Sequence, residues 1–145
     1  MIRVVLDTNI IVSALLQPLG PPAQVLVLAL GGSIQLCVSG SIYAEYEEVL
    51  RRPRLKRSED IIAGALAAIR ERGFWVRTMQ QVRACPDPDD DIFLQCAEAE
   101  GADYLVTGNL RHFPASWCGT RIVTPRWLLD NLPTGDPKED GKPSS

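Results

Sequence analysis

The first residues of the chain form an apolar run over positions 2–6 (IRVVL), which stops at Asp7, Thr8 and Asn9. Enrichment in valine and isoleucine without polar alternation is typical of a central parallel strand covered on both faces. In open α/β sheets the ligand crevice lies at the carboxyl ends of such strands. The run therefore predicts a buried strand that carries Asp7 to a candidate site, although an isolated aspartate at this place also commonly caps the next helix.

Apolar strands and amphipathic helices alternate along the chain as far as Leu132. Proline, glycine and serine residues separate them, as turn and capping signals do. The pattern predicts a three-layer α/β/α fold with a mostly parallel sheet of four or five strands, in which the first and fourth strands lie side by side. The further strands are expected at 34–38, 74–78, 103–107 and 121–123, and the helices at 10–16, capped by Thr8 or Asn9, and at 22–30, 42–50, 61–72, 88–97 and 125–132.

The length of 145 residues and the apolar content of 46% suit one domain with a real core. No apolar run reaches the roughly 18–20 residues that span a bilayer, so we expect a cytoplasmic protein without a membrane partner. The net charge of −3 argues against nucleic-acid binding through a uniformly positive surface. The tail 133–145 lacks apolar anchors and is expected to be disordered.

Two acidic residues occupy unusual places on their predicted helices. Glu45 lies at the edge of the apolar face of helix 42–50, where glutamate is more often fully solvated. Asp90 shares the apolar face of its helix, and an inward carboxylate must be paired, hydrogen-bonded or bound to a metal. Asp91 projects about 140° away from that face and is expected to face water. We therefore predict that Asp90, and not Asp89 or Asp91, is the metal ligand of this acidic run.

Small polar residues also follow the strand at 103–107, where Thr107 is succeeded by Gly108 and Asn109. This repeats the arrangement after the first strand, so both strand ends are expected to contribute to one site. The nearby His112 is expected to be a surface or hydrogen-bonding residue rather than a general base.

A basic run follows helix 42–50. One interpretation is a solvated helix end, and the other is a surface for phosphates or an acidic partner. Its cations are Arg51, Arg52, Arg54, Lys56 and Arg57.

These motifs together resemble the PIN-domain family, and within it the VapC-like ribonucleases that serve as toxins of prokaryotic toxin–antitoxin systems. The resemblance covers nearly all of residues 2–132 and implies a PIN-like nuclease domain over 1–132. It rests on the order and spacing of VLDTN at 5–9, Glu45, DPDDD at 87–91 and LVTGN at 105–109. It also implies an RNA substrate, a cognate antitoxin protein and a homodimer.

The resemblance assigns roles by position. Asp7, Glu45 and Asp90 fall on the acidic metal-site positions of the family. Asn109 lies where many members have a fourth acid, and because an amide is a neutral donor, a second metal would be held more weakly or with Asp87 or Asp91. The small polar positions beside the metal are Thr8, Asn9 and Thr107.

The residue types fit this chemistry independently. Mg²⁺ and Mn²⁺ prefer oxygen ligands, and a divalent cation activates water and offsets the charge on phosphoryl oxygens. Asp7 and Asp90 would be ligands, while Glu45 would be either a third ligand or the group that orients the attacking water. The expected activity is metal-dependent endoribonuclease cleavage of RNA phosphodiester bonds.

Two other functions remain open. A phosphatase with a strand-end aspartate nucleophile would also begin in this way, but Asn9 stands where its second aspartate is required. A catalytically weak or silent RNA-binding or partner-binding module on the same fold is the stronger alternative, because Asn109 replaces an acid.

Overall fold

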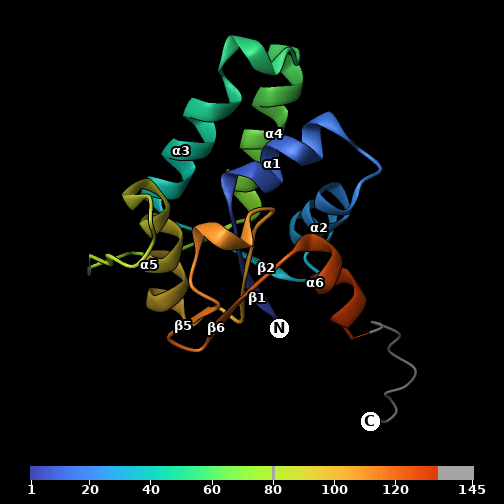
Figure 1. The fold of residues 1–145 in the computed structure, drawn as a ribbon. Helices are drawn as coiled ribbons and strands as arrows, with labels where there is room; N and C mark the ends of the chain where they lie inside the picture. The colour runs from blue at the N-terminus through green and yellow to red at the C-terminus, as the bar shows by residue number, and fades with distance from the viewer. Residues whose placement is uncertain (80, 134–145) are drawn as a thin grey trace.

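The computed structural model describes residues 1–79 and 81–133. Its centre is a six-stranded sheet with the order β3-β2-β1-β4-β6-β5, in which every pairing is parallel except that of β5 with β6 (Figure 1). The predicted α/β fold with a mostly parallel sheet is therefore confirmed. The strands are β1 Arg3–Leu6, β2 Gln35–Val38, β3 Phe74–Trp75, β4 Tyr104–Val106, β5 Ser116–Trp117 and β6 Thr120–Val123.

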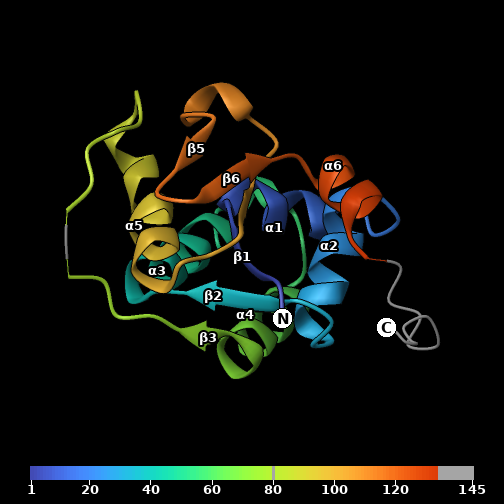
Figure 2. The ribbon, with the colours of Figure 1, turned by 90° about the horizontal axis from the view of Figure 1, so that it is seen from below.

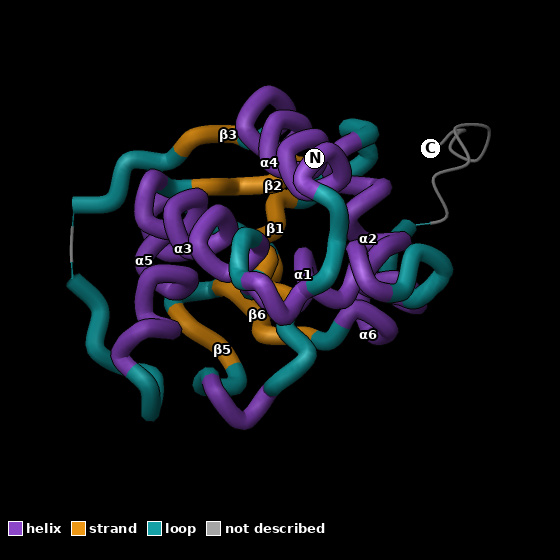
Figure 3. Tube along the Cα trace, turned by 90° about the horizontal axis from the view of Figure 1, so that it is seen from above, coloured by secondary structure: helices purple, strands orange, loops and turns teal. Residues whose placement is uncertain are grey.

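Helices lie on both sides of this sheet. Helix α5 lies on one side and packs against β1, β2 and β4, while α2 and α6 lie together on the other (Figures 2 and 3). The inner strands β1, β2, β4 and β6 are consequently largely buried, which explains their continuous apolar sequences, whereas the two-residue edge strand β3 is exposed. The helices are α1 Thr8–Leu16, α2 Pro21–Leu30, α3 Gly40–Leu50, α4 Glu59–Arg72, α5 Asp91–Glu100 and α6 Pro125–Asn131, and the short 3-10 turns are η1 Pro53–Leu55, η2 Pro88–Asp90 and η3 Leu110–His112.

The predicted pairing of the first and fourth strands is confirmed. Val5 is in register with Leu105, and the backbone N–H of Asp7 donates to the carbonyl of Val106 at 2.9 Å. The N–H of Thr107 donates in turn to the carbonyl of Val123 at 2.9 Å. The polar residues that follow β1 and β4 therefore meet at one edge of the sheet.

The predicted count of four or five strands is wrong by one or two. The additional β5 contains only two residues and pairs with β6 across a tight turn at Cys118 and Gly119, whose φ angles are 48° and 88°. A two-residue strand has no periodicity that a sequence pattern can detect. This hairpin adds the one antiparallel pairing at the sheet edge.

Serine caps start two helices as expected. Ser39 accepts a hydrogen bond from the N–H of Ile42 at 3.2 Å, and Ser58 accepts one from Ile61 at 3.3 Å. The prediction that Thr8 or Asn9 caps the first helix is wrong, because α1 already begins at Thr8 and Asp7 occupies the cap position. The Asp7 side chain nevertheless makes no capping bond, which leaves it available for another purpose.

None of the described helices is by itself long and apolar enough to cross a bilayer. Helices α1 and α2 reach the required length only as a pair, and the chain turns by 108° between them. The predicted disordered tail lies outside the described residues, apart from Pro133.

Candidate functional site

Asp7 is a buried carboxylate at the end of β1, with 6% of its surface exposed. Its Oδ2 accepts hydrogen bonds from Thr107 Oγ1 at 2.8 Å and from Asn9 Nδ2 at 3.0 Å. Burial raises the pKa of Asp7 and outweighs the opposing effect of the Thr107 hydrogen bond. Both side-chain hydrogen bonds fall on Oδ2, and the backbone N–H groups of Thr8 and Asn9 also favour the charged form of this carboxylate and so lower its pKa.

Glu45 lies on α3 and is half-buried, as its place on the helical wheel predicts. Thr8 Oγ1 lies 3.4 Å from its Oε2 and donates a weak hydrogen bond. Burial is the main cause that raises the pKa of Glu45. The adjacent Tyr46 is fully buried, and its hydroxyl donates to the carbonyl of Leu6 at 2.5 Å. This bond ties the helix of Glu45 to the strand of Asp7.

Asp90 is the last residue of η2, and 18% of its side chain is exposed. Burial and then the negative charge of Asp7 raise the pKa of Asp90 to about 6. The charges of Asp87 and Glu45 act in the same direction on the pKa of Asp90, while that of His112 opposes them. Asp7 and Glu45 therefore lie near enough to Asp90 for their charges to act on it.

This group fits a hard divalent cation. The ionised form of Asp7 is disfavoured by burial, and that of Asp90 by burial and by the charge of Asp7. A bound cation would offset both effects. Among the described residues, no three His, Cys, Asp or Glu side chains are arranged to bind one ion together. Mg²⁺ commonly takes one or two carboxylates and completes its shell with water and substrate phosphate, so Asp7 and Asp90 would be enough carboxylates for it.

Asp91 contradicts the prediction that it faces water. Its side chain is buried, with 6% exposed, and Oδ1 accepts the N–H groups of Ala84 at 3.1 Å and Cys85 at 2.8 Å. Burial alone would raise the pKa of Asp91, but these hydrogen bonds bring it below the usual value. Asp91 thus anchors the segment between β3 and α5. This segment covers the face of α5 that a helical wheel assigns to solvent.

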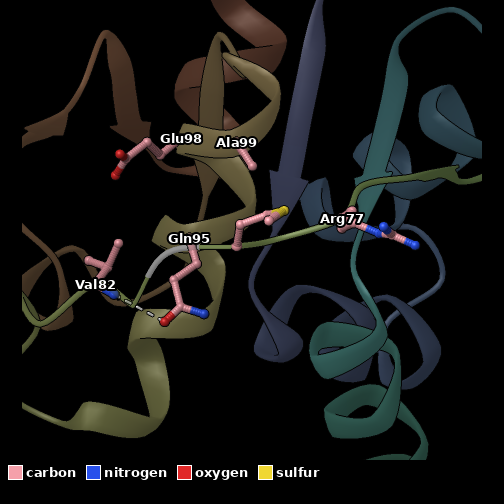
Figure 4. Close-up of a pocket in the computed structure, with 6 residues that line it drawn as sticks. Arg77, Val82, Gln95, Glu98 and Ala99 are labelled. Carbon is pink, nitrogen blue, oxygen red and sulfur yellow. Dashed lines mark hydrogen bonds between the residues drawn. The ribbon is translucent and has the colours of Figure 1, made fainter.

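Gln95 fastens the same segment one turn along α5. Its Oε1 accepts the N–H of Val82 at 3.2 Å, as the dashed line in Figure 4 marks. A pocket of about 320 Å³ lies between this segment and α5, lined by Val82, Gln95 and Glu98 among others. The pocket contains none of the site carboxylates, so we assign it no part in their chemistry.

The predicted supporting residues separate into two groups. Thr107 and Asn9 contact Asp7 directly, and the N–H of Asn109 donates to Thr107 Oγ1 at 3.0 Å. Asp87, in contrast, is exposed and caps η2, because its Oδ1 accepts the N–H of Asp89 at 2.9 Å. The exposed Asn109 side chain lies beside the site but brings no charge to it.

His112 is the one residue near the site whose position the sequence did not indicate. Its Nδ1 lies 3.7 Å from Asp90 Oδ2, and 54% of its side chain is exposed. The turn η3 brings it back toward the acidic cluster. A histidine three residues after Asn109 gives no signal of this contact until the turn is known.

The basic run is partly neutralised by the protein itself. Arg51 forms ion pairs with Glu59 and with Glu47, and Arg52 pairs with Glu48 at 2.8 Å. Two further contacts hold Arg57 to the end of α1, because its guanidinium donates to the carbonyls of Leu15 at 3.1 Å and Leu16 at 3.4 Å. The phosphate-binding interpretation of this run remains a prediction.

Comparison with known proteins identifies the family. A model described as the PIN domain matches residues 3–111. The chain belongs to the PIN-domain family. Proteins with this domain are generally nucleases, a class of hydrolase, and typically use divalent metals.

Two individual proteins resemble this PIN-domain chain. An uncharacterized protein of Methanocaldococcus jannaschii is 31% identical over 111 residues, which cover 74% of this chain and 71% of that protein. The crystal structure of VapBC2 from Rickettsia felis, bound to a DNA fragment from its promoter, matches with a TM-score of 0.56 and 15% identity. The match covers 85% of this chain and 98% of that one. The second comparison supports the PIN-like fold.

Proposed function

We propose that this protein is a Mg²⁺- or Mn²⁺-dependent endoribonuclease and the toxin of a toxin–antitoxin pair. The observation that carries the proposal is the meeting of Asp7 and Asp90, two largely buried carboxylates with raised pKa values, at the carboxyl edge of the sheet. Buried carboxylates that disfavour each other's charge are typical of sites that bind a cation or exchange a proton.

Each residue of the site has a defined task in this proposal. A bound cation would supply an activated water and offset the charge on the phosphoryl oxygens. Asp7 and Asp90 would hold the cation, with Asp7 fixed in orientation by Thr107 and Asn9. Glu45 accepts a hydrogen bond from Thr8, the residue after Asp7, and would either bind the cation or accept a proton from the attacking water, which its raised pKa favours.

A single tightly held cation is favoured over two. Asn109 is neutral and exposed, and Asp87 already uses Oδ1 to cap η2. Asp91 is buried and accepts two backbone amides on Oδ1, so it anchors the segment before α5. The three residues that the sequence offered for a second ion therefore contribute little to one.

The toxin assignment rests on the likeness to VapBC2, and it implies an antitoxin protein as partner. The basic run from Arg51 to Arg57 remains our candidate contact for that partner or for RNA phosphates. A homodimer and a location in the cytoplasm belong to the same proposal.

The test is cleavage of a labelled single-stranded RNA by purified protein, with Mn²⁺ binding measured by calorimetry. Asp7→Asn should lower the cleavage rate at least about 100-fold, equivalent to roughly 2.7 kcal/mol of transition-state stabilisation, and should weaken Mn²⁺ binding. Asp89→Asn is the matched control, because Asp89 is exposed. Cleavage that persists in Asp7→Asn, or that needs no divalent cation, would overturn the proposal.

One observation favours a second candidate function. Asn109 weakens the acidic site relative to the family pattern, so a module that binds RNA or a protein partner without cleaving is the alternative. RNA binding by wild-type protein with no cleavage in Mg²⁺ or Mn²⁺ would select it.

A further inference from the structure

A second pocket adjoins the acidic site on the side of α1, α2 and α6. Its volume is about 440 Å³, within the range of roughly 300–1,000 Å³ that is usual for small-molecule sites. Asn9, Gly108 and Asn109 form the wall nearest Asp7. Apolar and polar groups from three helices form the remainder, chiefly Ile10, Ser13, Pro21, Pro22, Thr124 and Arg126.

The wall between this pocket and Asp7 is fixed by hydrogen bonds. Asn9 donates from Nδ2 to Asp7 Oδ2 at 3.0 Å, and its Oδ1 accepts the N–H of Gly108 at 3.2 Å. The amide therefore bridges β1 and β4 and cannot turn without breaking one of these bonds. A ligand group seated against Asn9 would lie at a set position relative to the carboxylate.

The residues that line the pocket match the parts of a nucleotide, because some can contact a base and others can hydrogen-bond to a ribose. The half-buried rings of Pro21 and Pro22 present an apolar surface of the kind that packs against the face of an unstacked base. Ser13 and Thr124 supply hydroxyl groups that can hydrogen-bond to a base edge or a ribose 2′-hydroxyl. Arg126 is exposed and forms no ion pair within the part of the chain that the structure describes, so its charge is available to a phosphate.

We propose that this pocket receives the base and ribose of the nucleotide next to the scissile phosphate, with Arg126 on a neighbouring phosphate. The inference rests on the proposed ribonuclease function and narrows its substrate to single-stranded RNA, because a base held in a duplex cannot leave its stack to enter the pocket at low cost. The pocket would then determine which base is preferred at the cleavage site.

Site-specific crosslinking tests the position of the RNA whether or not the chain is cleaved. An oligoribonucleotide that carries 4-thiouridine at successive positions is irradiated with the Asp90→Asn protein, and the crosslinked peptides are mapped by mass spectrometry. One position should crosslink to 9–13, 21–22 or 124–126. Crosslinks confined to other segments, with RNA cleaved by the wild type, would overturn the pocket and leave the ribonuclease proposal intact. Crosslinks in the pocket without cleavage by the wild type would overturn the ribonuclease proposal and leave the pocket as an RNA-binding site.

Affinity and kinetics provide the second measurement. Arg126→Ala removes the cation, and Ser13→Phe fills the cavity. Each substitution should weaken RNA binding about tenfold and raise KM more than it lowers kcat. Arg72→Ala is the matched control, because Arg72 is an exposed arginine at the end of α4, which leads to the other edge of the sheet.

An abasic nucleotide identifies the pocket's occupant. If the pocket holds a base, removing the base at one position beside the scissile bond should weaken RNA binding about as much as Ser13→Phe does. The two changes together should weaken RNA binding no more than either change alone. Additive losses at both flanking positions would contradict a base in this pocket. Unchanged affinity in both protein variants would contradict any RNA contact there.

Discussion

Asp90 and Asp91 are consecutive residues in opposite environments. Asp90 faces other carboxylates, and its pKa is raised to about 6. Asp91 faces backbone amides of the β3–α5 segment, and its pKa is lowered. Asp90 is thus suited to bind a cation at some cost to the metal-free fold, whereas Asp91 uses Oδ1 to accept two backbone amides and stabilises the fold. Adjacent acids in a sequence motif can therefore serve separate purposes, one in chemistry and one in structure.

The largest expected effect distinguishes the two residues by activity. Asp90→Asn should reduce RNA cleavage about 1,000-fold, equivalent to roughly 4 kcal/mol, because it removes one of two charged ligands. It should also raise the free energy of unfolding of the metal-free protein at pH 7 by about 1–2 kcal/mol, since the disfavoured charge is gone. Denaturant unfolding in chelator and cleavage in Mn²⁺ measure the two effects. A variant that loses both stability and activity would mean that Asp90 is a structural residue like its neighbour.

The next effect is on stability. Asp91→Ala should lower the free energy of unfolding by about 2–3 kcal/mol, because two partly buried backbone amides lose their acceptor. Hydrogen exchange should become faster at Ala84 and Cys85 before it does elsewhere. Asp89→Ala is the control and should change stability by less than about 0.5 kcal/mol. An exposed, inert Asp91, as the helical wheel predicted, would instead leave both measurements unchanged.

A third prediction uses pH. In metal-free protein, folded Asp90 keeps its proton up to about pH 6, while the unfolded chain loses it near the ordinary value of 3.8. The folded state therefore binds more protons between these values, and its free energy of unfolding should fall by about 1–2 kcal/mol as pH rises through this window. Asp90→Asn should remove the share of that fall due to Asp90, and the raised pKa values of Asp7 and Glu45 should leave the remainder. Below about pH 4 the lowered pKa of Asp91 acts the other way, and its stabilisation is lost as pH decreases.

The smallest expected effect concerns the basic run, which contrasts with the acidic site because the charges of Arg51 and Arg52 are exposed. Reversing the charges of Arg54 and Lys56 should weaken RNA or antitoxin binding about tenfold and flatten its salt dependence, while Mn²⁺ binding stays unchanged. Titrations at two salt concentrations measure this. Equal affinity for both partners would leave the run as a solvated helix end.

The sequence predicted the parts of the site that depend on strands and missed those that depend on irregular segments. Asp7 and Thr107 follow apolar runs, and parallel topology alone brings such strand ends together. The prediction of Asp91 failed because the helix begins only there, after the turn η2, and because the segment from β3 covers its outer face. The contact of His112 with Asp90 likewise depends on a single 3-10 turn, which carries no periodic signal.

The buried hydroxyl of Tyr46 has a consequence for how this scaffold could be altered. It joins the helix of Glu45 to the carbonyl that immediately precedes Asp7. The spacing of two site carboxylates is therefore inherited from the hydrophobic interior, and surface loops can drift or be exchanged without resetting it. An engineer who grafts new RNA-recognition loops onto this framework would have to keep the buried phenol of Tyr46, whereas residues on the surface could be replaced.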